Sequence, residues 1–273
     1  MMQTQQTDDA RFAAHVRDAV RGAVQRGRPH FVGFLDMHQA ALAQAVRADG
    51  AQVCFWGGYD GAERVIFGAF PPDYDGGRPY AWRDDDEPEA SADTLHAAFP
   101  IVPLVLRCRA AVTLNHRDVL GALMGLGIER ATVGDIRTAP GRCVCLVRRE
   151  LAAPIAQQLT SVGREGVTVS AESAAELPQL MPDAQPPEEI SDTVASPRVD
   201  CVVASLAHCG RTAAAERIRA GLVQRNGVVC ASGSDLLAVG DVLVIRGAGK
   251  FTVRALGPQT RKGRLALRAD KAR

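Results

Sequence analysis

The stretch from Arg198 to Gly249 decides the fold of the C-terminal part of the chain. It reads RVDCVVASLAHCGRTAAAERIRAGLVQRNGVVCASGSDLLAVGDVLVIRGAG. Apolar residues recur at helical spacing from Val199 to Leu206, which predicts a first helix. After a polar break, a second helix is predicted from Thr212 to Ala220, with Thr212 as its N-cap and Gly221 just past its end.

Turn signals follow the second predicted helix. Asn226-Gly227 separates two short apolar runs, and Gly240-Asp241 leads into a predicted strand from Val242 to Ile245. Lys250 to Leu256 and Gly263 to Arg268 are predicted as a hairpin. Two short helices followed by small strands therefore make a compact module that carries several arginines.

The charge of the chain is unevenly distributed. The 273 residues have a formal net charge of only +1. From Ser196 to the C-terminus there are 14 Lys or Arg against 5 Asp or Glu, a net of +9, and the preceding residues have 18 against 26, a net of −8. A basic block on an otherwise acidic protein indicates a localised phosphate-binding surface. Arg211 lies at the start of the second predicted helix, where a guanidinium can bind a phosphate group through two hydrogen bonds. Arg211→Glu is therefore expected to abolish the binding of phosphate-bearing partners at physiological salt and to keep the melting temperature of the wild type.

The order of these features resembles the alpha-L RNA-binding domain. The matching residues are Arg198-Val199-Asp200, Gly210-Arg211-Thr212, Gly221 with Val223, Asn226-Gly227 and Gly240-Asp241. Gly210 stands where that family usually has Ser, and Arg225 stands where it usually has an apolar residue. The resemblance and the basic tail together imply a set of RNA contacts. The candidates are Arg198, Arg211, Thr212, Arg217, Arg219, Arg225, Asn226, Lys250, Arg261, Lys262 and Arg264.

Residues 1–75 are predicted to form a small N-terminal α/β domain. Asp8 to Arg26 has an apolar stripe at helical spacing, and Asp36 to Ala48 opens with a capping Asp. Gln52 to Trp56 and Arg64 to Phe70 are predicted as strands. The glycine-rich connection between them lacks the Gly-Lys-Ser/Thr ending of a phosphate loop, so it is predicted as a structural turn.

A connector rich in Pro, Gly and acid follows the first domain. Its acidic run from Arg83 to Glu89 is predicted as a solvated loop and not as a metal cluster. The seven cysteines are scattered and show no pair of Cys or His at zinc spacing, which favours reduced structural thiols.

Residues 95–175 are predicted to form a ferredoxin-like (split βαβ) middle domain, which makes the fold class α+β. The predicted order is strand 101–107, helix 117–126, hairpin 133–138 with 143–148, helix 151–162 and strand 167–171. Residues 176–197 are rich in proline and acid and are predicted as an extended linker. Residues 198–273 then form the C-terminal module with its basic hairpin.

The most distinctive string of the middle domain runs from Leu114 to Ile128. Within it, His116-Arg117-Asp118 is similar to a kinase catalytic loop, but Leu123 stands where that loop needs Asn. A general base would also need a partner and a pocket, and the sequence indicates neither for His116. A capping or surface role is therefore predicted for His116 and Arg117.

Several strings together resemble one family over about residues 12–268. They are Gly57-Gly58-Tyr59, Ala62-Glu63-Arg64, the run from Leu114 to Ile128, Gly134-Asp135-Ile136 and the C-terminal module. This set resembles the YlmH family of bacterial RNA-binding proteins. The resemblance implies a cytosolic protein that binds the large ribosomal subunit when it carries obstructed peptidyl-tRNA. The implied role is to hold tRNA during ribosome-associated quality control, and some relatives are linked to cell division.

The resemblance also sets the expected partners and sites. The partners are rRNA of the large subunit and tRNA or peptidyl-tRNA, bound by a monomer with no cofactor, no metal, no catalytic residue and no membrane span. His116 and Arg117 are a second candidate RNA surface.

An RNA-modifying enzyme of the pseudouridine synthase type, targeted by the alpha-L module, is the alternative. It would need a catalytic Asp in an Arg-Leu-Asp setting within a larger α/β domain, whereas Arg198-Val199-Asp200 belongs to the module helix. A purely structural ribosomal protein would be basic throughout, unlike the acidic first two thirds of this chain. The sequence therefore favours a non-enzymatic RNA-binding factor.

Overall fold

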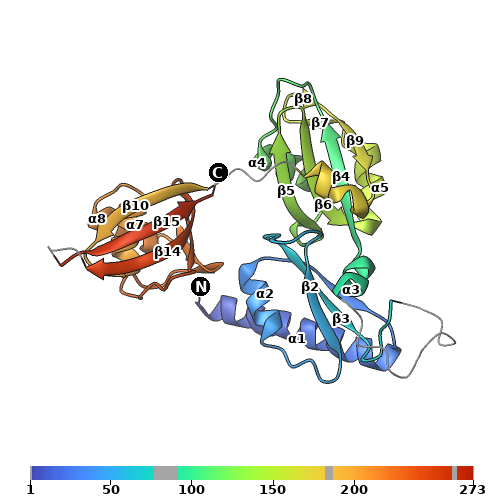
Figure 1. Cartoon of the computed structure of the whole chain (residues 1–273), viewed down its shortest axis with the longest axis horizontal. Coiled ribbons are helices and arrows are strands. Elements are labelled where there is room, and N and C mark those ends of the chain that lie inside the picture. Colours follow the sequence, from blue (N-terminus) through green and yellow to red (C-terminus); the bar gives the residue numbers. More distant parts are fainter. Residues whose placement is uncertain (1, 77–91, 182–186, 260–262, 273) are drawn as a thin grey trace. The chain divides into compact units, whose positions relative to one another are not determined.

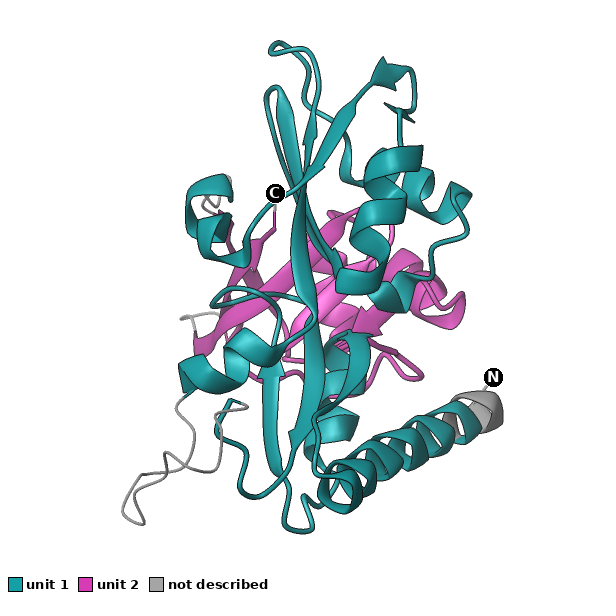
Figure 2. Cartoon of the chain, turned by 90° about the vertical axis from the view of Figure 1, so that its right-hand side faces the viewer, with its two compact units in different colours: residues 1–182 teal, residues 183–273 magenta. Residues whose placement is uncertain are grey.

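The computed structural model describes residues 2–76, 92–181, 187–259 and 263–272, and the side chains from residue 7 onward. The chain forms two compact units, residues 1–182 and 183–273 (Figure 2). The predicted acidic loop at 83–89 and the candidates Arg261 and Lys262 lie outside the described residues. Within the described parts, no helix is long and apolar enough to cross a membrane.

A long helix and a three-stranded antiparallel sheet begin the first unit (Figure 1). The elements are α1 (Met2–Arg26), β1 (His30–Leu35), α2 (Met37–Gln44), β2 (Gln52–Trp56) and β3 (Val65–Phe70), with strand order β1-β3-β2. Asp36 caps α2 through a capping box with Gln39, as its position in the sequence predicts. The apolar stripe of α1, including Val16 and Val20, packs against Phe67 of β3.

Strand β1 was not predicted from the sequence. The run HFVGFL is only six residues long and contains a glycine, and a short apolar run of this kind has no periodicity that separates strand from helix. Its pairing with β3 supplies the missing information, since Phe34 and Leu35 become buried only when β1 lies beside β3.

The second part of the first unit has the ferredoxin-like order that the sequence predicts. Its four-stranded antiparallel sheet has the order β5-β6-β4-β9, which places the second, third, first and fourth strands side by side. The elements are α3 (Ala92–Ala98), β4 (Ile101–Arg107), α4 (His116–Gly125), a 3-10 turn η2 (Arg130–Thr132), β5 (Val133–Ala139), β6 (Arg142–Arg148), α5 (Arg149–Gln158), β7 (Ser161–Val162), β8 (Glu165–Gly166), β9 (Thr168–Ala171), η3 (Ala174–Glu176) and α6 (Leu177–Leu180). The helix predicted to reach Val162 ends at Gln158, because residues 161–166 form the β7–β8 hairpin.

The two parts of the first unit share a hydrophobic core. Phe34 and Phe70 from the first sheet pack in one cluster with Phe99, Val144 and Leu146. Residues 1–182 therefore form one body, in which the turn between β2 and β3 lies against the edge strand β5.

The described residues of the second unit form a six-stranded antiparallel sheet and two helices (Figure 1). The elements are β10 (Glu188–Val194), α7 (Val199–Leu206), α8 (Arg211–Arg219), β11 (Val223–Arg225), β12 (Val228–Val229), β13 (Val242–Ile245), β14 (Gly249–Gln259) and β15 (Leu265–Lys271), in the order β10-β15-β14-β13-β11-β12. Apolar residues of both helices, such as Val202 and Ile218, pack on Leu243, Phe251 and Leu267 of the sheet.

Two details of the second unit correct the sequence-based predictions. The predicted linker 176–197 contains β10, which pairs with β15 from Glu188 to Val194, so part of this interval is an edge strand and not extended linker. This strand is rich in acidic residues and has only two apolar side chains, Ile190 and Val194, so its sequence does not show the pattern of a strand. The N-cap of α8 is Gly210 and not Thr212, two residues earlier than predicted, and Arg211 is the first residue of the helix.

Candidate nucleic-acid interface

A buried carboxylate joins two of the candidate arginines in the second unit. Asp200 lies in the first turn of α7, and its side chain is only 10% exposed. Arg198 donates to both of its oxygens at 3.1 and 3.0 Å, and Arg211 at the start of α8 donates to Oδ2 at 3.2 Å. The hydrogen bonds from Arg198, and next those from Arg211, lower the pKa of Asp200 to about 2 against the opposing effect of burial. We call these three residues the Asp200 cluster, and its net charge is +1.

The Asp200 cluster changes the expected outcome of one substitution. Arg211→Glu would place a second carboxylate beside the shielded Asp200, and like charges at this distance repel. The expectation that Arg211→Glu keeps the melting temperature of the wild type therefore does not follow from this geometry.

The remaining candidates on α8 are more accessible. Thr212 and Arg219 are exposed, and Arg219 has no hydrogen bond or ion pair among the described residues. Arg217 is half-buried and donates to the carbonyl oxygen of Arg246 at 3.3 Å. Arg219 is thus the candidate whose charge can be changed with least effect on the fold.

Arg225 and Asn226 are held by an internal network. The Asp241 carboxylate, 8% exposed, accepts from the guanidinium of Arg225 at 2.7 Å, from the Asn226 amide at 2.8 Å and from the Ala238 N–H at 2.7 Å. Burial opposes ionisation of Asp241, and the three donors outweigh it, so its pKa stays below the usual value. The Asn226 side chain also accepts from Val242 N–H, which fixes the turn where Asn226 and Gly227 both have positive φ. These contacts give both candidates a structural role.

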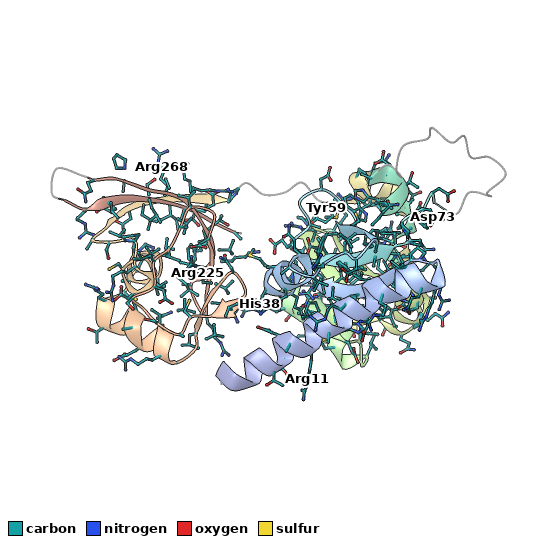
Figure 3. All side chains as sticks on the ribbon, turned by 90° about the horizontal axis from the view of Figure 1, so that it is seen from below. Arg11, His38, Tyr59, Asp73, Arg225 and Arg268 are labelled. Atoms are coloured by element: carbon teal, nitrogen blue, oxygen red, sulfur yellow. The ribbon has the colours of Figure 1, made fainter. Side chains whose placement is uncertain are left out.

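The candidates near the last two strands lie on the other side of the sheet from α7 and α8. Arg268, a further basic residue of this region outside the predicted set, is exposed between buried Leu267 and Ala269, so it points away from the helices (Figure 3). Lys250 pairs with Val244 in the β13–β14 ladder. Arg264 donates to the side-chain and backbone oxygens of Thr193, which fastens β10 to the start of β15. The structure thus divides the predicted set between two faces of the second unit.

His116 and Arg117, the second candidate surface, lie in the first turn of α4. Asn115 caps this helix by accepting from the Arg117 N–H at 2.8 Å, and both candidates are exposed. The predicted capping role therefore belongs to Asn115. Partial desolvation, followed by the positive charge of Arg130, lowers the pKa of His116.

A carboxylate beside His116 ties the two parts of the first unit together. Asp135 of β5 is 8% exposed and accepts from Tyr59 Oη at 2.5 Å. It also accepts from the backbone N–H groups of Glu63 and Arg64 at 2.8 and 3.0 Å. Tyr59 in turn accepts from Arg137 at 3.1 and 3.2 Å, and Figure 3 labels Tyr59 in the turn between β2 and β3. Burial first, and then Asp135, raise the pKa of Tyr59 to about 12.

We call the group Tyr59, Arg64, His116, Arg130, Asp135 and Arg137 the junction cluster. Only His116 among them was predicted as a site residue. The sequence resemblance to a family includes three strings from this cluster, which are Gly57-Gly58-Tyr59, Ala62-Glu63-Arg64 and Gly134-Asp135-Ile136. The first two strings lie more than 70 residues before the third, so the sequence alone could not show that they contact one another.

The cysteines and acids give no sign of a metal centre within the described residues, where no group of three or more His, Cys, Asp or Glu side chains could hold an ion. Burial raises the pKa of the Cys143 thiol to about 12 and that of its neighbour Cys145 even further. Such thiols stay protonated and act as small apolar side chains.

Comparison with known proteins identifies the family. A family model described as "Putative RNA-binding domain in YlmH" matches residues 108–176. The chain is 30% identical over 257 residues to "Ribosome-associated protein quality control protein P2" of Bacillus subtilis (strain 168), and the match covers 93% of this chain and 92% of that protein. Among solved structures, "Cell division protein ylmH from Streptococcus pneumoniae" has a TM-score of 0.50 and 16% identity, covering 64% of this chain and 95% of that one.

The structural likeness supports the fold alone at this level of identity. The match to the Bacillus subtilis protein runs through nearly the whole of both chains, and the family model covers His116, Arg117, Arg130, Asp135 and Arg137. The chain therefore belongs to the YlmH family of bacterial RNA-binding proteins.

Proposed function

We propose that this chain is a non-enzymatic factor that binds the large ribosomal subunit when it carries obstructed peptidyl-tRNA. There it stabilises the tRNA during ribosome-associated quality control. The observation that carries the proposal is 30% identity over 93% of the chain to the Bacillus subtilis protein whose name assigns it to ribosome-associated protein quality control. The partners are rRNA of the large subunit and tRNA or peptidyl-tRNA, and the protein acts in the cytoplasm as a monomer.

The helical face of the second unit supports RNA binding. Its order of two helices followed by strands fits an alpha-L RNA-binding domain, which we assign to residues 183–273 because β10 belongs to this sheet. Arg198 and Arg211 converge at the start of α8, and Arg219 extends the charge along the helix. Guanidinium groups bind phosphate oxygens in a bidentate manner, and each neutralised phosphate releases counterions. Binding should therefore weaken strongly as salt rises.

The contacts of Asp200 favour binding over catalysis. Arg198-Val199-Asp200 is the string that comes nearest to the catalytic setting of a pseudouridine synthase. The Asp200 carboxylate is held by two guanidiniums and is 10% exposed, so it is poorly placed to attack a base. We accordingly assign no catalytic residue and no cofactor.

Co-sedimentation with purified large subunits tests the proposal. Full-length protein should pellet with subunits that carry peptidyl-tRNA more strongly than with empty subunits, at near-physiological salt. The retained fraction should fall steeply between 50 and 200 mM salt, as expected for contacts to several phosphates. Equal pelleting with small subunits, or no preference for subunits carrying peptidyl-tRNA, would refute it. Base modification of rRNA or tRNA by the pure protein would refute its non-enzymatic part.

A further inference from the structure

Two arginines of the junction cluster share one acceptor. Arg64 Nε donates to the carbonyl oxygen of Val133 at 3.1 Å, and Arg130 donates to the same oxygen at 2.5 Å. Arg64 also donates to the carbonyl oxygen of Phe34. Two guanidiniums that meet at one neutral oxygen repel each other, and this repulsion is strongest where the groups are partly withdrawn from water.

The buried carboxylate nearest to them, Asp135, forms no ion pair with their guanidiniums, and its charge acts on them only from a longer distance. The oxygens of Asp135 accept hydrogen bonds from the Tyr59 hydroxyl and from the backbone N–H groups of Glu63 and Arg64. Arg137 donates only to the neutral Tyr59 hydroxyl. Within the described parts of the chain, no carboxylate lies within ion-pair distance of the guanidiniums of Arg64, Arg130 and Arg137.

Burial and neighbouring charges both act on the pKa values of the cluster. Burial, and then the charge of Arg130, lower the pKa of Arg64 to about 10, and burial lowers the pKa of Arg130 as well. His116 responds in the same direction. The carboxylates of Asp135, Asp36 and Glu63 oppose these shifts without forming ion pairs with the three arginines. Burial lowers the pKa of Arg137 too, but the hydrogen bond to Tyr59 and the charges of Asp135 and Glu63 outweigh it and raise that pKa.

We propose that the junction cluster is a phosphate-binding site, and that its ligand is a phosphodiester group of the bound RNA. An oxyanion between Arg64 and Arg130, with Arg137 and His116 at its rim, would relieve the repulsion and use guanidinium donors that carbonyl oxygens leave free. The RNA assignment rests on the proposed function. The site lies partly outside residues 108–176, because Tyr59 and Arg64 belong to the turn before β3.

The test compares full-length Arg130→Gln with the wild type. Glutamine removes the charge and keeps an amide donor, on a side chain two atoms shorter than that of arginine. We expect an unchanged or higher melting temperature, because the repulsion from Arg64 disappears. Arg17→Gln is the matched control, since Arg17 is exposed on α1 and makes no ion pair in the described structure.

The first readout is the salt dependence of binding to a single-stranded RNA oligonucleotide. Loss of one phosphate contact should flatten the slope of log affinity against log salt by about 0.7, so that affinity falls about threefold less between 50 and 200 mM salt. RNA crosslinks to residues 59–64 and 116–137 should be lost in Arg130→Gln and kept in Arg17→Gln. An unchanged slope with crosslinks retained would overturn the proposal.

The second readout separates RNA from a small phosphate compound. Inorganic phosphate, exchanged for chloride at constant ionic strength, should raise the melting temperature of the wild type more than that of Arg130→Gln. Stabilisation by phosphate with no change in RNA slope or crosslinks would overturn the RNA assignment. If Arg130→Gln melted at a lower temperature than wild type and its RNA affinity kept the same salt dependence, the cluster would have only a structural role. If Arg130→Gln does not fold, Arg137→Gln replaces it, because the bonds of Asp135 stay intact.

Neither of these two readouts uses ribosomes. Failure of co-sedimentation would therefore count against the proposed function, and failure of these two readouts would count against the junction site.

Discussion

Asp200→Asn tests whether one carboxylate stabilises the second unit and restrains its RNA-binding arginines. Asn keeps the shape of the side chain and one acceptor oxygen. It removes the negative charge and turns an amide N–H toward a guanidinium. Arg198 and Arg211 then face each other without their shared partner. We therefore expect the unit to lose stability and to gain affinity for RNA.

The magnitude follows from the pKa. The lowering of the pKa of Asp200 from 3.8 to about 2, caused first by Arg198, corresponds to roughly 2.5 kcal/mol of stability at neutral pH. The side chains of Arg198 and Arg211 are 37% and 59% exposed, and solvent screening reduces the value to about 1–2 kcal/mol. For a unit of this size, the melting temperature should fall by about 5–15 °C.

The pH dependence has a definite sign. Because the folded-state pKa is depressed, the stabilisation is complete above the unfolded-state value near 4 and is lost as the pH falls toward about 2. The difference between wild type and Asp200→Asn should therefore be full at pH 6 and should shrink between pH 4 and pH 2.5.

Hydrogen exchange of α7 and β10 peptides in urea would measure the second unit within the full-length chain. Tryptophan fluorescence gives an internal control for the first unit, because both tryptophans precede residue 183 and Trp56 lies in β2. Equal exchange in both proteins at pH 6, or a difference that persists unchanged at pH 2.5, would refute a stabilising role for this carboxylate. If folded Asp200→Asn bound RNA more weakly than wild type, the idea that Asp200 holds Arg198 and Arg211 back from RNA would be wrong.

Three other predictions have defined outcomes. Arg219→Glu should weaken co-sedimentation with the large subunit and keep the melting temperature, whereas Glu216→Lys on the same helix should bind at least as well as wild type; equal binding by both would move the surface off α8. Tyr59→Phe removes a donor to Asp135 and should lower the stability of the first unit by about 1–2 kcal/mol in calorimetry, so an unchanged transition would contradict the contact. RNA affinity should rise as the pH falls from 7.5 to 5.5, because a bound phosphate favours the charged form of His116, whose pKa is lowered in the free protein. A His116→Gln variant with the same pH profile as wild type would exclude this coupling.

Local patterns were sufficient to predict most helices and strands. The capping Asp36, the apolar stripe of α1 and the turn at Asn226-Gly227 depend on residues close together in the sequence, and the structure contains all three. The ferredoxin-like order also followed from the succession of elements. Strands β1 and β10 escaped prediction because their identity depends on a partner, β3 or β15, that lies far away in the chain.

The roles of individual site residues were harder to predict for the same reason. A list of basic residues in the second unit could not show that Asp241 binds Arg225 or that Asp200 binds Arg198 and Arg211. Charge composition counts these arginines as equally available. Their carboxylate partners distinguish the ones that hold the fold from Arg219, which faces solvent without a partner in the described structure.

The strings that carry the family resemblance in the first unit are explained by packing at the junction. A Cβ atom on Gly57 would lie 2.4 Å from the carbonyl oxygen of Arg64, and one on Gly134 would lie 2.6 Å from the ring of Phe34. Both contacts are too short for any side chain. Glycine at position 57 therefore lets the turn before β3 close tightly on itself, and glycine at position 134 lets Phe34 of β1 approach β5. That approach brings Asp135 within reach of the turn and places Arg64 beside Arg130. The same glycines that close the core of the first unit thus bring together cations that no carboxylate pairs in the described structure, which is the condition for an anion to bind there.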